Sequence, residues 1–161
     1  MSGDEQLYNC LNNLQGSKTI ILGIGNTLKG DDGAGPVVCR QLAGKTSAEL
    51  INADTVPENY IQHIIKKAPR NLLIIDAIDF GGSPGTINIF KPEQLNSLVV
   101  STHILSPRIF VDMITQVINV DVYFIGVQPA QTAFGQFLSD NIKEALRHLV
   151  DVLVEIFPLE E

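Results

Sequence analysis

The 161-residue sequence has little cysteine, little positive charge and no long apolar run. Its two cysteines, Cys10 and Cys39, are too few for a disulfide framework or a paired zinc motif, so both are expected to be reduced thiols. The 11 Lys and Arg residues are outnumbered by 18 Asp and Glu residues, and the resulting net charge of −7 argues against a nucleic-acid-binding protein. No apolar run reaches the roughly 18 residues of a membrane span, and the acidic start MSGDEQLYNC is unlike a signal peptide. These absences favour a cytoplasmic protein.

The apolar content and its spacing predict a single folded domain over residues 1–161. Hydrophobic residues make up 45% of the chain and charged residues 18%, a composition that excludes intrinsic disorder. Apolar or β-branched runs predict strands at 18–24, 49–53, 71–76, 86–90 and 120–127. The run at 71–76 has the continuous apolar character of a strand that is buried on both faces. Residues 1–17 form an N-terminal extension of unknown role.

Helix signals fall between these strands. Apolar spacing predicts helices over 33–42, from Pro57, over 106–117 and from Ser139 onward. Thr55 and Glu58 are spaced as a capping box, while Ser106 and the pair Ser139-Asp140 are expected helix caps. Strands that alternate with helices predict an α/β fold, a three-layer α/β/α sandwich with a twisted, mostly parallel five-stranded sheet.

A glycine-rich segment follows the first strand and invites comparison with a dinucleotide-binding motif. Gly23 and Gly25 match the start of that motif, but the third glycine comes late, at Gly30. Asp31 and Asp32 follow directly, and two carboxylates would repel a pyrophosphate. A nucleotide- or phosphate-binding α/β enzyme is therefore kept as an alternative only.

Polar side chains that suit a metal gather in the loops where ligands of parallel sheets bind, beyond the carboxyl ends of strands. The loops after the first strand, the third strand and the 86–90 strand hold Asp31, Asp32, Asp76, Asp79 and His103. One aspartate before a helix is often an N-cap, but two aspartates flanked by glycines exceed that need. Carboxylates and one imidazole on neighbouring loops predict an open site for a divalent transition metal, with too few histidines for a usual zinc site.

The other two histidines, His63 and His148, lie within predicted helices and are expected to be solvated or structural.

These residues resemble the hydrogenase maturation endopeptidases, which remove the C-terminal extension from the precursor of a nickel–iron hydrogenase large subunit. The resemblance spans roughly residues 18–156 and rests on motifs in the family's order. Those motifs are Gly23–Asn26, Gly30–Pro36, Leu72–Ala77, the Pro84-Gly85 turn, Ser101–His103 and Gly126–Pro129. The Gly30–Pro36 run and Gln128-Pro129 are most similar to the branch that serves formate-hydrogenlyase-type hydrogenases.

The resemblance implies a set of roles for the site residues. Asp32, Asp76 and His103 take the positions that contact nickel and carry catalysis, although some relatives have the longer Glu where Asp32 stands. Nickel is expected in the substrate precursor, bound by its cysteines, with no cofactor tightly held by this chain. The implied substrate-binding residues are Gly33, Gly35, Asp31 and Asp79, of which the two aspartates have helix capping or support of the ligands as alternatives.

The implied partner is the large-subunit precursor, met by a chain that is expected to be a monomer. Two hypotheses for the hydrolytic step stay open. In one, the metal polarises the scissile carbonyl or activates water. In the other, nickel only docks the substrate, and Asp31, Asp32 or Asp76 serves as general base. A metal-carrying maturation chaperone that performs no hydrolysis would use the same ligands and is a further alternative.

Overall fold

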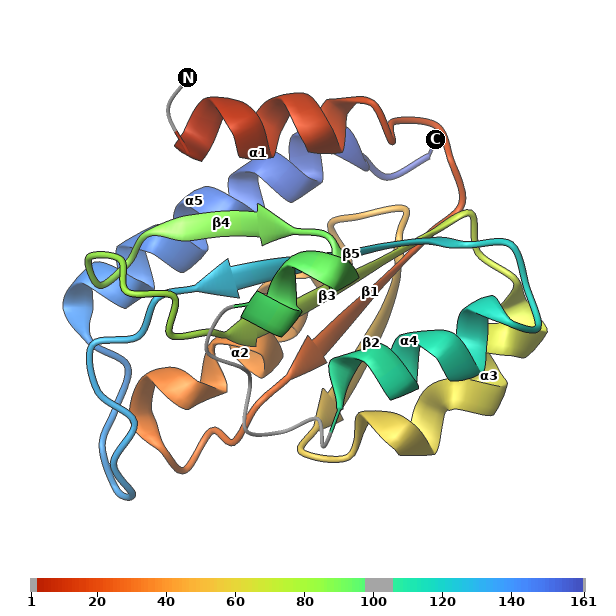
Figure 1. Cartoon of the computed structure of the whole chain (residues 1–161). Helices are drawn as coiled ribbons and strands as arrows, with labels where there is room; N and C mark the ends of the chain where they lie inside the picture. Colours follow the sequence, from red (N-terminus) through yellow and green to blue (C-terminus); the bar gives the residue numbers. More distant parts are fainter. Residues whose placement is uncertain (1–2, 98–105, 161) are drawn as a thin grey trace.

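A five-stranded sheet forms the centre of the computed structural model, which describes residues 3–97 and 106–160 (Figure 1). The strands are β1 (Thr19–Ile24), β2 (Glu49–Asp54), β3 (Asn71–Ala77), β4 (Ile87–Phe90) and β5 (Asp121–Val127). Their order across the sheet is β2-β1-β3-β5-β4, with β4 antiparallel to β5 and the other pairs parallel. The expected mostly parallel five-stranded sheet is confirmed, and the 86–90 segment is its antiparallel edge.

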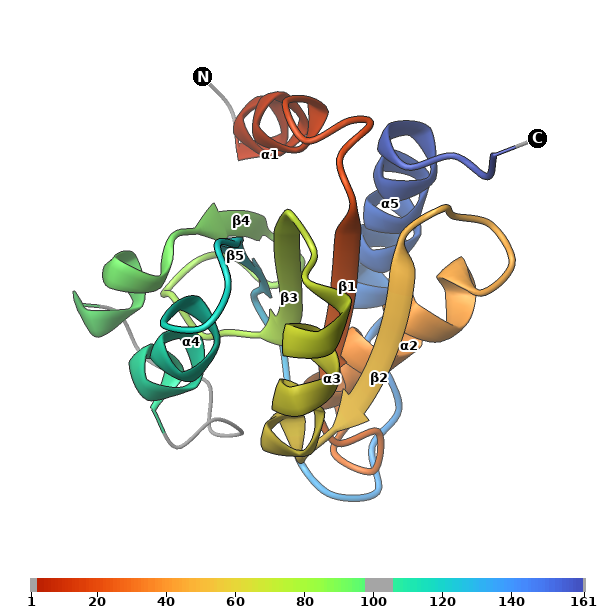
Figure 2. The ribbon, with the colours of Figure 1, turned by 90° about the vertical axis from the view of Figure 1, so that its right-hand side faces the viewer.

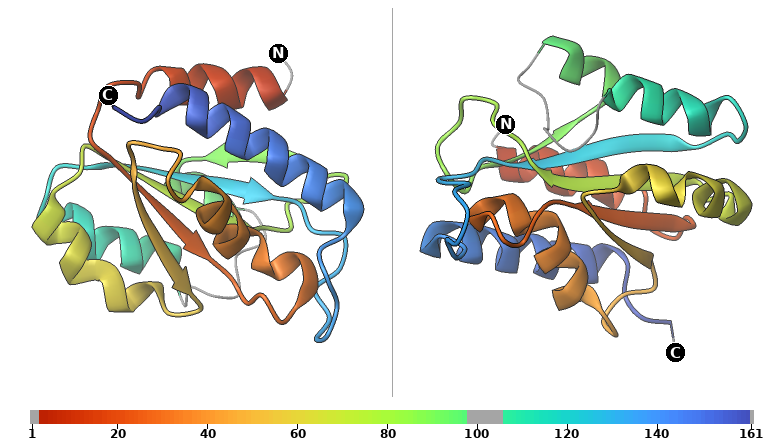
Figure 3. Two further views of the ribbon diagram at one scale, coloured as in Figure 1. Left: turned by 180° about the vertical axis from the view of Figure 1, so that it is seen from behind. Right: turned by 90° about the horizontal axis from the view of Figure 1, so that it is seen from below.

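Helices cover both faces of the sheet, which confirms the three layers (Figures 2 and 3). One apolar core lies between the sheet and the helices α1 (Gly3–Asn12), α2 (Ala34–Leu42) and α5 (Asp140–Ile156). A second core lies on the other face, under α3 (Ile61–Lys67) and α4 (Pro107–Thr115). Short 3₁₀ helices occur at η1 (Gly30–Gly33), η2 (Pro57–Tyr60) and η3 (Pro92–Ser97).

The central strands owe their apolar sequences to these two layers. All residues of β1 and β3 are buried, and successive side chains enter opposite cores. Leu73 and Ile75 belong to the core under α2 and α5, whereas Leu72 and Ile74 belong to the core under α3 and α4. This two-sided burial explains why the pattern at 71–76 predicts a strand so clearly.

The N-terminal extension is part of the fold. Residues Gly3–Asn12 form α1, whose Leu7 and Leu11 are fully buried in the same core as α2 and α5. The helix contacts β4 and α5 and thereby completes the layer on that face. The extension without a predicted role is therefore a structural element that covers the edge-strand half of the sheet.

Two of the predicted side-chain caps do not form. Thr55 does not cap the segment after β2; η2 begins after Val56, whose N–H donates to the Ala53 carbonyl at 3.0 Å, and no side chain caps it. Ser139 occupies the N-cap position of α5 without capping it, because its hydroxyl bonds elsewhere. Ser106 is confirmed as the cap of α4, since its Oγ accepts from the Ile109 N–H at 3.3 Å.

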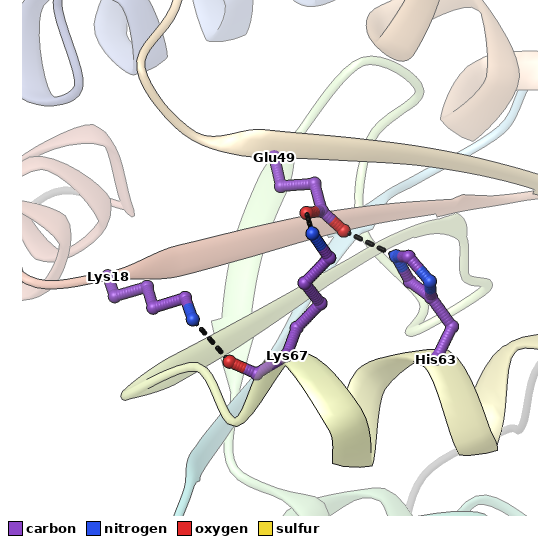
Figure 4. Close-up of polar contacts among 4 residues, drawn as sticks. All are labelled: Lys18, Glu49, His63 and Lys67. Atoms are coloured by element: carbon purple, nitrogen blue, oxygen red, sulfur yellow. Dashed lines mark hydrogen bonds and ion pairs between the residues drawn. The ribbon is translucent and has the colours of Figure 1, made fainter.

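A polar cluster fixes α3 against the edge of the sheet (Figure 4). On β2, the Glu49 carboxylate contacts His63 Nε2 at 2.6 Å and Lys67 Nζ at 3.5 Å, and both partners lie on α3. Lys18, just before β1, donates to the carbonyl oxygen of Lys67. His63 is therefore structural, as expected, and such half-exposed pairs orient elements more than they stabilise them.

Within the described ranges 3–97 and 106–160, the structure contains no helix with the length and apolarity needed to cross a bilayer.

At Gly35, α2 packs directly against the backbone of the sheet, and replacing this residue tests the packing. A Cβ at Gly35 would lie 2.5 Å from the Ile75 carbonyl oxygen and would also overlap the backbone of Ile24. We expect Gly35→Ala to lower the free energy of unfolding by about 1–3 kcal/mol, because backbone cannot yield like a side chain. Urea denaturation measures this, with Gln41→Ala on the exposed side of α2 as control. Equal stability of the two variants would contradict the close approach.

Candidate active site

The candidate site lies where the sheet order reverses. The chain proceeds from β1 to β2 on one side and places β3 on the other, so loops diverge at the carboxyl ends of β1 and β3. Ligands of open α/β sheets bind at such switch points. Asp32 lies in η1, which follows β1 and contacts β3, and Asp76 is the last residue but one of β3. The fold thus brings two of the predicted ligands to one edge of the sheet.

Both of these carboxylates are buried. Asp32 is 6% exposed and Asp76 is 1% exposed. The Asn26 N–H donates to Asp32 Oδ2 at 3.0 Å, and this bond holds the loop after β1 against η1. The turn depends on Gly25, where φ is +150° and a Cβ would overlap the Asp32 carbonyl. Burial of carboxylates is unfavourable in itself, so two at a switch point indicate a functional site.

His103, the third predicted metal-contacting residue, lies outside the described residues. The described chain resumes at Ser106, and α4 leads from there back to the start of β5, so its first turn faces the edge of Asp32 and Asp76. The loop directly after the 86–90 strand was expected at this edge, which is wrong. Because β4 is antiparallel, it runs away from this edge, and its last residue, Phe90, pairs with Phe124 in the middle of β5. In residues 3–97 and 106–160, no three His, Cys, Asp or Glu side chains are grouped to hold a metal.

Asp31 has a different environment from its neighbour. Its carboxylate is 1% exposed and accepts four hydrogen bonds from the segment before α5. Oδ2 accepts from the N–H groups of Ala130 (2.9 Å) and Gln131 (3.0 Å) and from the Ser139 hydroxyl (2.9 Å). Oδ1 accepts from the Ser139 N–H at 2.8 Å. This geometry favours a structural role, whereas substrate binding by Asp31 stays a prediction.

Gln128 organises the loop that follows Asp76, a role that the sequence analysis missed. Its buried Oε1 accepts from the N–H groups of Phe80 (2.9 Å) and Gly82 (3.0 Å). Its Nε2 donates to Asp79 Oδ1 at 3.0 Å, and the Gly81 N–H donates to the same oxygen. The amide of Gln128, followed by the Gly81 N–H, lowers the pKa of Asp79 below its ordinary value. The only sequence signal for this residue was its place in a family motif.

The two glycines predicted to bind substrate are buried within the protein. Gly35 lies against the backbone of Ile24 and Ile75, and a Cβ at Gly33 would come 2.8 Å from Thr27 Cα. Their smallness allows η1 and α2 to approach β1 and β3 closely. Contact of these glycines with substrate stays a prediction, as it does for the exposed Asp79.

Known proteins with similar sequences identify the family of this chain. The family model described as hydrogenase maturation protease matches residues 38–156. This chain belongs to the hydrogenase maturation protease family. The chain is 34% identical over 130 residues to the hydrogenase 3 maturation protease of Escherichia coli K12, covering 79% of this chain and 83% of that protein. It is 33% identical over 162 residues to a putative hydrogenase maturation protease of Methanocaldococcus jannaschii, covering 94% and 92%.

A solved structure of the family shows the same fold. The crystal structure of the [NiFe] hydrogenase maturation protease HycI from Thermococcus kodakarensis KOD1 superposes with a TM-score of 0.82 at 35% identity. The match covers 91% of this chain and 97% of that chain. Membership of this family confirms that the chain is a peptidase, as the resemblance implied.

Removing the charge of Asp31 tests its structural role in this family member. Asp31→Asn turns one acceptor oxygen into an amide donor that faces N–H and O–H donors. We expect the free energy of unfolding to fall by about 2–4 kcal/mol, because several donors lose their charged acceptor. Chemical denaturation measures the change, and Asp151→Asn on the exposed side of α5 is the matched control. An Asp31→Asn protein as stable as this control would show that the carboxylate does not hold the segment.

Truncating Gln128 tests the loop after β3. We expect Gln128→Ala to destabilise the protein by about 1–3 kcal/mol, because the Phe80 and Gly82 N–H groups lose their acceptor. We also expect the pKa of Asp79 to rise toward its ordinary value of 3.8, as measured by NMR titration of its carboxyl carbon. Because the pKa of Asp79 is lowered in the folded state, its carboxylate stabilises the fold above about pH 3.8, and this contribution is lost as the pH falls. Gln128→Ala lacks the contribution, so its free energy of unfolding falls less in acid than that of the parent protein. The exposed Gln62→Ala on α3 is the control; an unchanged Asp79 pKa in Gln128→Ala would refute the assignment.

Proposed function

We propose that this peptidase removes the C-terminal extension from the nickel-loaded precursor of a nickel–iron hydrogenase large subunit. The observation that supports this most directly is the pair of buried carboxylates, Asp32 and Asp76, at the switch point of the sheet. A family of hydrogenase maturation proteases that shares this fold supplies the reaction class.

Nickel enters the proposal as part of the substrate. Two carboxylates, with His103 from the segment outside the described residues, offer oxygen and nitrogen ligands that suit a divalent transition metal. Three ligands leave coordination positions open, so this chain alone would bind the ion weakly. Thiolates of the precursor would complete the coordination shell, which would make cleavage depend on both metal and substrate.

The hydrogen bonds of Asp31 narrow the choice of general base. Both of its oxygens already accept hydrogen bonds, so proton abstraction from water would break the contacts that hold residues 130–139. Asp32 and Asp76 are the two remaining carboxylates of the base hypothesis. In the competing hypothesis they contact the metal, which then polarises the scissile carbonyl or activates water.

The structure argues against one of the two alternative functions and leaves the other to experiment. A phosphate cradle over Gly25–Gly33 is disfavoured, because the turn at Gly25 is filled by the Asp32 carbonyl and two buried carboxylates lie in the same loop. A metal-carrying chaperone would use the same ligands without hydrolysis, so only a cleavage assay separates it from the protease.

We further propose that the reaction takes place in the cytoplasm, with the protein acting as a monomer. Both cysteines are free thiols, as a reducing compartment requires. Cys39 is buried, and burial raises its thiol pKa to about 11, which keeps it protonated and unreactive at neutral pH.

The proposal predicts cleavage that depends on nickel. The cognate precursor is prepared with and without nickel, incubated with the protein and followed by intact mass. We expect loss of a C-terminal peptide from the nickel-loaded form only. No cleavage of either form by the folded protein would favour the chaperone, whereas equal cleavage of both forms would keep the protease and remove the nickel requirement.

Asp32→Asn separates binding from chemistry. We expect the variant to lose cleavage by a factor of 100 or more, on the order of one catalytic group's contribution. Co-sedimentation with the nickel-loaded precursor shows whether the complex still forms, and Asp151→Asn is expected to cleave at the parent rate. A complex that persists without cleavage would exclude a pure docking role for Asp32, while parent-level cleavage would remove Asp32 from the active site.

A further inference from the structure

An exposed apolar surface lies directly beside the candidate active site. Leu28, Phe134 and Phe137 are 66%, 70% and 86% exposed, although apolar side chains of this size are usually buried. Leu28 precedes η1, the 3₁₀ helix that carries Asp32, and the two phenylalanines lie in the loop between β5 and α5. Figure 1 shows this loop, in blue, projecting beyond the sheet next to the segment after β1. We call these three side chains the apolar surface.

The backbone beneath the apolar surface is held in place. The Gly135 N–H donates to the Leu28 carbonyl at 2.9 Å, and the Gly30 N–H donates to the Gln136 carbonyl at 3.2 Å. The carboxylate of Asp31 binds the same loop at both of its ends, through Ala130, Gln131 and Ser139. A fixed surface loses little conformational freedom when a partner binds, as suits a recognition site.

Positive charge surrounds these apolar side chains in a protein whose net charge is −7. Lys29 Nζ lies 5.4 Å from the centre of the Phe134 ring. A pocket of about 280 Å³ beside Phe137 is lined by the exposed side chains of Arg40 and Lys143. Arg40 has no carboxylate partner in the described part of the chain, and the Lys143 contact to Asp140 is long, at 3.9 Å. The pocket also reaches Gly30 and Gly33, which flank the site aspartates.

We infer that the apolar surface and the adjoining basic pocket bind a segment of the substrate precursor in which apolar side chains are accompanied by Asp or Glu. The inference rests on the proposed function, and it names the chemistry by which the protease recognises its substrate. Aromatic side chains would supply the apolar contact area, and Arg40, Lys29 and Lys143 would pair with the acidic groups. Because Leu28 of the apolar surface lies just before η1, a bound segment would run toward Asp32.

The charges also argue against self-association as the purpose of this surface. In a two-fold dimer the same patch meets itself, so the three basic side chains of one copy would face those of the other. An acidic segment of a different protein meets no such repulsion.

Steady-state cleavage of the nickel-loaded precursor tests the inference. We expect the double variant Phe134→Ser, Phe137→Ser and the charge reversal Arg40→Glu each to raise KM by about tenfold or more, with kcat little changed. The matched controls are Leu159→Ser, an apolar residue 56% exposed near the C-terminus, and Lys66→Glu on the exposed side of α3. Circular dichroism confirms that each variant is folded.

Two further measurements keep the test independent of any single variant. We expect the KM of the parent protein to rise with ionic strength and the slope to flatten in Arg40→Glu. An Asp or Glu to Lys change in the precursor should restore cleavage by Arg40→Glu if the two groups pair.

The outcomes separate this inference from the proposed function. Parent-level KM in both surface variants, or equal losses in the controls, would overturn the inference while the cleavage itself still supports the protease. If the parent protein does not cleave the precursor, the proposed function fails. The role of the apolar surface is then tested by comparing the affinities of the parent and the surface variants for the precursor. A parent that is a dimer and surface variants that are monomers would assign the surface to self-association and overturn the inference.

Discussion

The buried carboxylate of Asp31 connects the two halves of the active-site region. It lies in η1 after β1, and its four hydrogen bonds reach residues 130–139, which connect β5 to α5. A backbone bond from the Asp31 N–H to the Gln131 carbonyl, 3.0 Å long, adds to this connection. Because these contacts position the backbone next to Asp32, the geometry around Asp32 depends on the hydrogen bonds of its neighbour.

A second polar side chain performs the same task on the other side of the site. Gln128 follows β5 and binds the loop after β3 through Phe80, Gly82 and Asp79. Both anchors use a short stretch at the carboxyl end of β5 to hold the loops of β1 and β3. The edge of the sheet is thus a set of loops tied to one another as well as to their own strands, which gives a peptidase a rigid framework for its reacting groups.

The sequence predicts the sheet well because a local apolar pattern marks each strand of this fold. Burial on both faces makes 71–76 apolar without interruption, and the alternation at 86–90 is typical of an edge strand, which β4 is. The capping box at Thr55 fails because η2 begins one residue later, with Val56 at the N-cap position. Leu7 and Leu11 have the spacing of an apolar helix face, but so short a pattern does not say what the face packs against. The burial of α1 follows from the core that it meets.

The site was predictable in part. Asp32 and Asp76 stand beside glycines or at the end of a strand, where sequence position alone suggests a ligand. The roles of Asp31 and Gln128 depend on partners up to 108 residues away, which no local pattern encodes. Gln128 belongs to a family motif, but the motif alone gives no structural role for its side chain.

The distance in sequence between Asp31 and Ser139 also determines when this part of the fold can form during synthesis. The bonds at Ser139 join residues 108 apart, and Ser139 begins the helix that closes the core over β1 and β3. A nascent chain that has released Asp32 and Asp76 from the ribosome still lacks the segment that fixes their surroundings. The surroundings of these two carboxylates are therefore complete only after α5 has been synthesised.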